Sequence, residues 1–142
     1  MNDDLRPVLL VEDSNDDADL IRCAWGRAGI RNALERVEDG DKACDRLGDA
    51  ARPPPALVLL DLKLPRRSGH EVLQWIRGHG DEAVRRFPVV VFTSSDQEGD
   101  LRLAYDRGAN SSLVKPVRSQ ALVDLVAQHN SYWLVLNKLP SA

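Results

Sequence analysis

The chain is poor in cysteine, and neither its cysteines nor its histidines are spaced like metal ligands. Cys23 and Cys44 form no CxxC pair, so the sequence indicates neither a disulfide framework nor a cysteine metal site. His70, His79 and His129 lack metal-ligand spacing as well. We therefore expect buried or unreactive thiols, and histidines that bind no metal.

Long hydrophobic runs are also missing. No window approaches the roughly 18 uninterrupted apolar residues of a membrane span. Residues 1–11 lack the basic segment and the apolar stretch of a secretory signal. The 19 basic residues are scattered, and with 22 acidic residues they give a net charge of −3, which argues against a nucleic-acid-binding surface. We expect a cytoplasmic protein that binds neither membranes nor nucleic acid.

Length and composition indicate one domain. The chain has 142 residues, of which 43% are hydrophobic and 29% charged, and this length is enough for one core but short for two. We expect a single domain over residues 1–142. Its core would span about 6–128, and residues 129–142 would form a C-terminal helical extension.

Strand and helix patterns alternate along the chain. Apolar tetrads at 8–11, 57–60 and 89–92 are typical of strands covered on both faces, and weaker patterns at 34–37 and 113–114 predict two more strands. The first predicted helix starts near Asn15 or Asp16, a suitable N-cap, and stops at Gly29. Three more helices cover 40–47, 69–77 and 97–107, and a fifth extends from about 118 to about 138. Such alternation implies right-handed crossovers and a parallel sheet, which gives a doubly wound (βα)5 sandwich.

Chemically distinctive residues follow four of these strands: Glu12, Asp13, Asp61, Thr93 and Lys115. In such a sheet the ligand site lies beyond the carboxyl ends of the strands, so these residues should converge. Three crowded carboxylates repel one another unless a cation compensates, and oxygen ligands favour Mg²⁺. Any one of these residues alone would more often cap a helix or face solvent, but that interpretation weakens greatly for the set.

The set predicts a phosphoryl acceptor site. Asp61, between the paired acids and the distal lysine, is best placed to attack phosphorus, and Lys115 can neutralise charge on the phosphoryl oxygens. Thr93 can donate its hydroxyl to a phosphoryl oxygen, and the small Ser94 leaves room for a donor. Pro116 restricts the backbone of Lys115, and a cis bond before Pro116 is one form this restriction can take.

Four stretches together resemble the receiver domain of two-component response regulators. They are 8–14 (VLLVEDS), 59–69 (LLDLKLPRRSG), 90–95 (VVFTSS) and 113–116 (LVKP), and the resemblance covers nearly the whole chain. It implies a flavodoxin-like sheet with strand order 2-1-3-4-5. It also implies that Asp61 is the phosphoacceptor, that Thr93 and Lys115 contact the phosphoryl group, and that Mg²⁺ is bound by four groups: Glu12, Asp13, Asp61 and the backbone carbonyl of Lys63.

Within this family the chain is most similar to stand-alone regulators paired with bacterial phytochromes. The shared features are the VEDS stretch at 11–14, the FPVVV run at 87–91 and the SYWL stretch at 131–134. The resemblance implies a histidine kinase as donor, with a bacteriophytochrome as a candidate, and a homodimeric regulator. No DNA-binding module follows the receiver pattern, so we expect output through protein contacts or a phosphorelay.

Two features concern how the signal leaves the domain. Many receivers have an aromatic residue three places before the lysine, whereas this chain has Ser112, so phosphorylation is expected to alter the surface only modestly. The C-terminal stretch is apolar and predicts a two-fold dimer contact, although folding back over its own domain is an alternative. The predicted contact residues are Tyr132, Trp133, Val135 and Leu136.

Three other functions fit the sequence less well. A pseudo-receiver that acts only as a binding module would be expected to lack an acid or the lysine, and the chain has both. A haloacid-type hydrolase typically has a second aspartate where this chain has Lys63. In an FMN-binding protein with the same sheet order, Glu12 and Asp13 would repel the phosphate. We therefore expect a signalling phosphoacceptor that assists its own phosphorylation and dephosphorylation, and otherwise no enzyme.

Overall fold

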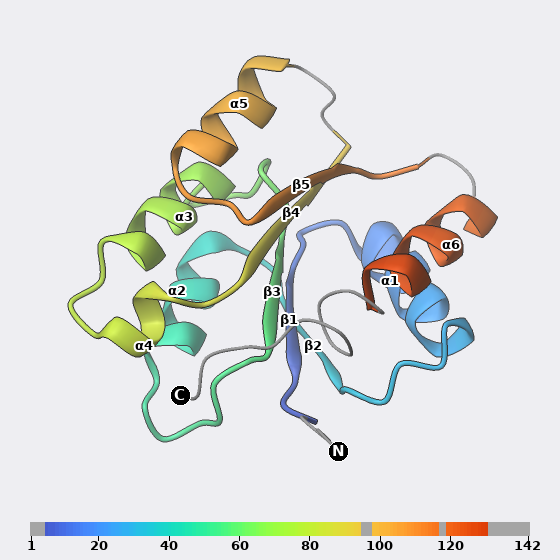
Figure 1. The fold of residues 1–142 in the computed structure, drawn as a ribbon, viewed down its shortest axis with the longest axis horizontal. Helices are drawn as coiled ribbons and strands as arrows, with labels where there is room; N and C mark the ends of the chain where they lie inside the picture. Colours follow the sequence, from blue (N-terminus) through green and yellow to red (C-terminus); the bar gives the residue numbers. More distant parts are fainter. Residues whose placement is uncertain (1–4, 95–97, 117–118, 131–142) are drawn as a thin grey trace.

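Five parallel strands form one sheet in the centre of the molecule (Figure 1). The computed structural model describes residues 5–94, 98–116 and 119–130. The strands are β1 (Val8–Val11), β2 (Leu34–Val37), β3 (Leu57–Leu60), β4 (Val89–Thr93) and β5 (Ser111–Val114). They follow the order β2-β1-β3-β4-β5, and all four neighbouring pairs are parallel, which confirms the doubly wound sheet.

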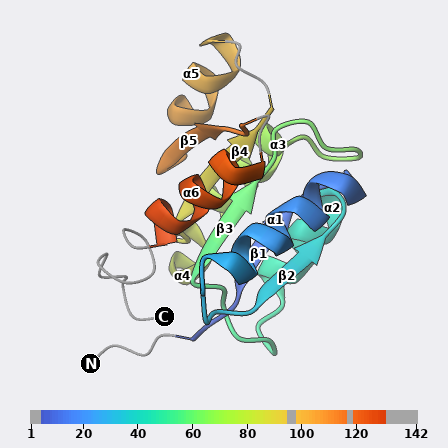
Figure 2. The same ribbon diagram turned by 90° about the vertical axis from the view of Figure 1, so that its right-hand side faces the viewer.

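Helices cover both faces of the sheet (Figures 1 and 2). Helices α1 and α6 pack against each other on one face, and α2 and α3 lie together on the other, where α3 also contacts α4 and α5. The helices are α1 (Asn15–Arg27), α2 (Gly40–Gly48), α3 (Gly69–Arg77), α4 (Glu82–Arg85), α5 (Glu98–Asp106) and α6 (Ser119–Asn130). In the described part of the chain, no helix is long and apolar enough to cross a membrane.

The period of two in the central strands divides the core into two clusters. In β1, Leu9 and Val11 pack with residues of α2 and α3, whereas Val8 and Leu10 pack with residues of α1 and α6. The strands β3 and β4 divide in the same way. This two-sided burial explains why these segments read as unbroken apolar runs.

Helix α1 begins just after Glu12 and Asp13, and its N-cap holds the loop that carries these two acids. Its N-cap is Ser14, whose hydroxyl accepts a hydrogen bond from the backbone N–H of Asp17 at 3.2 Å. The expectation of an N-cap at Asn15 or Asp16 was therefore wrong by one or two residues. The helix ends at Arg27, and Gly29 then adopts a φ of 69°, as the sequence predicted for a glycine stop.

Several element bounds differ from those expected. The short α4 was not predicted, because a single turn leaves little hydrophobic periodicity to detect. Strand β5 begins at Ser111 and not at the predicted Leu113. Ser111 and Ser112 pair with β4 but give no apolar signal, so the sequence pattern missed them. Residues 129 and 130 of the predicted C-terminal extension end α6, whereas 131–142, which include the four predicted dimer contacts, lie outside the described residues.

Candidate functional site

The backbone brings the predicted residues to one edge of the sheet. The N–H of Glu12 donates to the carbonyl of Val37 at 3.1 Å, and the N–H of Asp61 donates to the carbonyl of Val11, also at 3.1 Å. On the other side, the N–H of Lys115 donates to the carbonyl of Thr93 at 2.8 Å. The parallel ladder thus places all these residues at the carboxyl ends of the strands.

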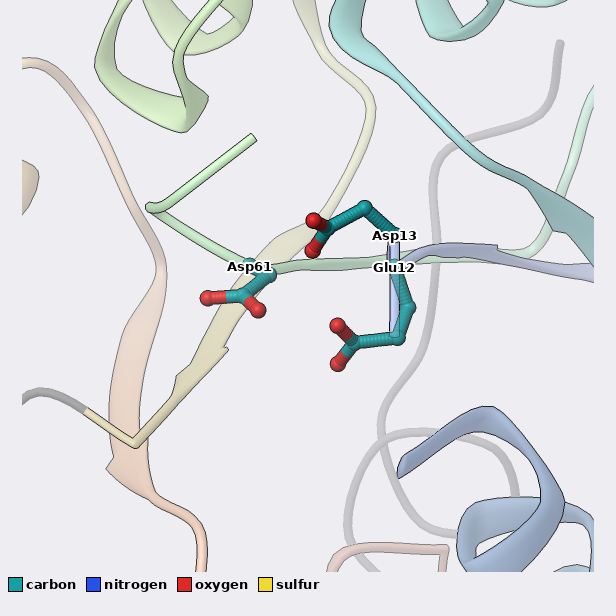
Figure 3. Close-up of side chains that lie close together, drawn as sticks. All are labelled: Glu12, Asp13 and Asp61. Carbon is teal, nitrogen blue, oxygen red and sulfur yellow. The ribbon is translucent and has the colours of Figure 1, made fainter. Parts of the chain in front are cut away.

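Three carboxylates form what we call the acid group: Glu12, Asp13 and Asp61 (Figure 3). Each offers one oxygen, and these oxygens lie within 4.8 Å of one another. Glu12 and Asp61 are buried, while Asp13 is exposed, so an ion can reach the acid group from solvent at Asp13. Three hard oxygen donors at this spacing fit a divalent cation such as Mg²⁺.

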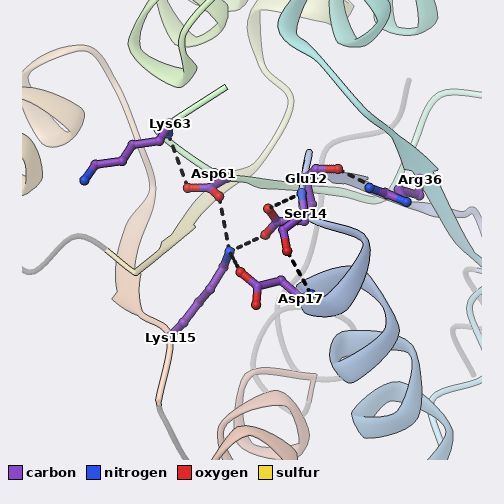
Figure 4. Close-up of polar contacts among 7 residues, drawn as sticks. All are labelled: Glu12, Ser14, Asp17, Arg36, Asp61, Lys63 and Lys115. Carbon is purple, nitrogen blue, oxygen red and sulfur yellow. Dashed lines mark hydrogen bonds and ion pairs between the residues drawn. The ribbon is translucent and has the colours of Figure 1, made fainter. Parts of the chain in front are cut away.

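Lys115 is the cation that faces the acid group. Its side chain is 10% exposed, and its Nζ donates to Oδ2 of Asp61 at 3.2 Å, to Oδ2 of Asp17 at 3.1 Å and to Oε1 of Glu12 (Figure 4). The structure therefore brings Lys115 to the predicted acceptor. It also adds Asp17, which sequence reasoning missed, although it stands in the first turn of a helix that follows the paired acids.

Burial and charge perturb two of these groups. Burial raises the pKa of Glu12 to about 7, the hydrogen bond from Lys115 opposes this rise, and the charge of Asp61 adds to it. Burial alone would lower the pKa of Lys115, but Glu12 and Asp61 together outweigh it and raise that pKa. The lysine therefore stays protonated beside the carboxylates.

Asp61 is held from two sides. Its Oδ1 accepts a hydrogen bond from the backbone N–H of Lys63 at 3.3 Å, and its Oδ2 faces Lys115 (Figure 4). Gly69, the first residue of α3, lies directly behind it, because a Cβ at that position would come within 2.3 Å of the Asp61 carbonyl oxygen. The carbonyl of Lys63 as a metal ligand stays a prediction.

The remaining predicted residues complete the same edge. Thr93 is the last residue of β4 and is fully buried, whereas Ser94 after it is exposed. No peptide bond in the described ranges is cis, so the bond before Pro116 is trans. The restriction of Lys115 by a cis bond is thus ruled out.

Two supporting residues were not foreseen. Arg36 on β2 donates from Nε to the backbone carbonyl of Glu12 at 2.9 Å (Figure 4). It also donates from Nη1 to Oδ1 of Asn15 at 2.8 Å, so it braces the acidic loop. Tyr105 on α5 accepts a hydrogen bond at its hydroxyl from the backbone N–H of Ser112 at 3.1 Å. An aromatic side chain thus contacts position 112, although none occupies it.

Comparison with known proteins decides the family. The family model described as "Response regulator receiver domain" matches residues 8–127. The chain belongs to this family. A receiver is a signalling phosphoacceptor that binds a divalent cation, and a response regulator implies a cognate histidine kinase.

Several relatives match this receiver over most of their length. A probable methanogenesis regulatory protein of Methanothrix harundinacea, FilR2, is 43% identical over 136 residues, which are 94% of this chain and 86% of that protein. Response regulator Rcp1 of Synechocystis is 36% identical, with 100% of both chains covered. A Mn²⁺-bound structure of Rcp1 has a TM-score of 0.85, with 34% identity and coverage of 96% and 99%.

A third relative has a solved structure in its phosphorylated form. It is the phosphorylated cyanobacterial phytochrome response regulator RcpA, whose structure has a TM-score of 0.86, 34% identity and coverage of 96% of this receiver and 99% of that chain. These likenesses confirm the receiver fold and the similarity to phytochrome response regulators. They leave the role of each site residue as a prediction.

Proposed function

We propose that this receiver is a stand-alone response regulator that accepts a phosphoryl group on Asp61. The main support is one arrangement: the buried Asp61 carboxylate lies within the acid group and 3.2 Å from the ammonium of Lys115. A nucleophilic oxygen therefore stands between a candidate cation site and a fixed positive charge. We further propose that residues 1–142 form one receiver domain, with a core of about 6–128.

The proposed reaction needs positioning more than covalent chemistry. The phosphorus–nitrogen bond of a phosphohistidine breaks, a bond from an Asp61 oxygen to phosphorus forms, and the released imidazole takes up a proton. Lys115 neutralises charge on the phosphoryl oxygens, and Thr93 donates its hydroxyl to one of them. The exposed Ser94 leaves space for the donor, and Pro116 limits the backbone freedom of Lys115.

The bound cation would be Mg²⁺, which would supply positive charge to the transferring phosphoryl oxygens. Glu12, Asp13, Asp61 and the Lys63 carbonyl would hold it. The donor set supports this assignment, because Mg²⁺ prefers oxygen ligands. The Mn²⁺ found in the Rcp1 structure is also compatible with oxygen donors, and therefore supports a hard divalent cation.

Intact mass spectrometry tests the acceptor. The protein is incubated with a small phosphodonor and Mg²⁺, and we expect one added phosphoryl group. The Asp61→Asn variant and a sample with chelated metal should remain unmodified, because the nucleophile or the cation is missing. The exposed Asp19→Asn change on α1 makes the same charge change as a matched control and should leave modification intact.

Two results would contradict this proposal. Modification of the Asp61→Asn protein to the same extent would refute the acceptor. No modification of the unaltered protein would favour the binding-module alternative, in which the receiver fold serves contacts alone.

We propose that a bacterial phytochrome kinase is the donor and that transfer takes place in the cytoplasm. RcpA is named as a phytochrome regulator, and the motif resemblance points the same way. FilR2 is named for methanogenesis regulation, so the test must compare kinases. Phosphotransfer from a bacteriophytochrome kinase should be fast and change with red and far-red light, and faster transfer from an unrelated kinase would contradict the assignment.

We also propose a homodimer that forms through the C-terminal extension. Residues 131–136 read SYWLVL, an apolar stretch of the kind that forms a partner surface, and the proposed contacts are Tyr132, Trp133, Val135 and Leu136. Light scattering should show a dimer mass for the full chain and a monomer mass for a version that ends at Gln128. Equal monomer masses at all concentrations would contradict the dimer.

A further inference from the structure

Lys115 contacts one carboxylate that lies outside the acid group. Its Nζ contacts Glu12, Asp61 and Asp17, but only the first two belong to the three acids whose oxygens cluster within 4.8 Å. We propose that Asp17 is a positioning residue that keeps the Lys115 ammonium when a divalent cation binds the acid group, and that it thereby strengthens cation binding. This inference rests on the proposed function.

The ammonium and the cation compete for the same oxygens. Lys115 contacts two of the three carboxylates in the acid group, and its side chain is 10% exposed, so solvent screens it little. Two like charges among the same oxygens repel strongly at this depth. A cation that binds Glu12 and Asp61 must therefore weaken the contacts of Lys115 with both.

Asp17 offers the ammonium a place that the cation does not need. Its Oδ2 lies 3.1 Å from Nζ (Figure 4), and its side chain is 39% exposed. Its backbone is held in the first turn of α1 by the hydrogen bond from its N–H to the Ser14 hydroxyl at 3.2 Å. Asp17 can thus retain Lys115 near Asp61 without giving up any oxygen of the acid group.

The inference predicts a specific change in Mg²⁺ affinity. In Asp17→Asn the ammonium loses its charged alternative and stays on Glu12 and Asp61, so Mg²⁺ should bind roughly five- to tenfold more weakly in a calorimetric titration. Asp17→Glu keeps a carboxylate and should restore most of the affinity. Circular dichroism and the free energy of unfolding verify that each variant is folded.

A double-mutant cycle with Lys115→Met separates this role from a general charge effect. Lys115→Met removes the competitor, so it should raise Mg²⁺ affinity, and in that background Asp17→Asn should cost less than about twofold. Asp19→Asn is a matched control, because it makes the same charge change on α1 in an exposed pair with Arg22. It should also cost less than about twofold in both backgrounds.

The outcomes distinguish this inference from the proposed function. An equal loss of affinity on Asp17→Asn in both backgrounds would overturn the positioning role of Asp17 alone. No binding of Mg²⁺ to the unaltered protein would overturn both the positioning role and the proposed metal site. A loss seen only in the background that retains Lys115 would support the positioning role.

Discussion

At the residue scale, the protonation of Glu12 links the acid group to pH. This carboxylate is 1% exposed, and burial raises its pKa to about 7. A carboxylate must lose its proton before it can bind a cation. The raised pKa therefore places this proton loss within the physiological range.

The affinity for Mg²⁺ should rise with pH. Below about pH 7 Glu12 is mostly protonated, so each bound Mg²⁺ must displace a proton, whereas well above pH 7 the carboxylate is already free. We expect Mg²⁺ affinity to be about tenfold lower at pH 6 than at pH 8, measured by calorimetric titration.

Glu12→Gln is the matched control for this dependence. It should bind Mg²⁺ more weakly at every pH but show little change in affinity between about pH 6 and pH 8, because the titrating group is gone. An unaltered protein whose affinity is flat across this range would contradict the assigned role of Glu12.

The positions of residues at strand ends were enough to predict part of the site. The contacts that helix side chains make with the site could not be predicted. Glu12, Asp61 and Lys115 could be assigned because a strand end fixes where each one lies. Asp17 and Tyr105 could not, because their contacts depend on how α1 and α5 pack beside the sheet. Helical spacing alone does not specify which side chain reaches a neighbouring strand.

At the element scale, the junction of β3 and α3 positions the proposed acceptor, Asp61. Gly69 opens α3, its N–H donates to the carbonyl of Leu62 at 2.9 Å, and a Cβ there would come within 2.6 Å of the Leu62 Cα. The nearest atoms belong to the backbone and cannot rotate away. A larger residue would therefore displace the loop that carries Asp61.

Gly69→Ala tests this close contact. We expect the free energy of unfolding to fall by about 1–3 kcal/mol, as for overpacked sites, and phosphorylation of Asp61 to slow, because the loop must shift. Chemical denaturation and the phosphodonor reaction measure the two effects. Gly26→Ala is the control, because a Cβ there meets nothing within 4 Å, and it should stabilise the protein by up to about 1 kcal/mol. Equal effects of the two substitutions would contradict the close-contact explanation.

The elements that sequence patterns predicted best are the doubly buried strands. Segments β1, β3 and β4 stand out because burial on both faces forces continuous apolar residues. The edge strand β5 is only partly buried and begins with two serines. The apolar pattern therefore missed its start. Edge strands carry weaker patterns because fewer of their side chains enter the core.

At the scale of the whole molecule, the sheet connects the site to the face formed by α5 and β5. Thr93 ends β4 beside the acid group, and its carbonyl binds the N–H of Lys115 just after β5. Further back along β5, Ser112 contacts the hydroxyl of Tyr105 on the exposed side of α5. A shift at Thr93 therefore has a short backbone route to the α5–β5 face, even though position 112 lacks an aromatic side chain.

The acceptor itself can be tested most directly by trapping the acyl phosphate. The protein is phosphorylated with a small donor and Mg²⁺, reduced with borohydride and digested, and peptide mass spectrometry then locates the resulting homoserine. We expect homoserine at position 61 and at no other aspartate, because Asp61 combines burial, the acid group and the Lys115 ammonium. Homoserine at Asp13 or Asp17 with Asp61 intact would contradict Asp61 as the phosphoacceptor.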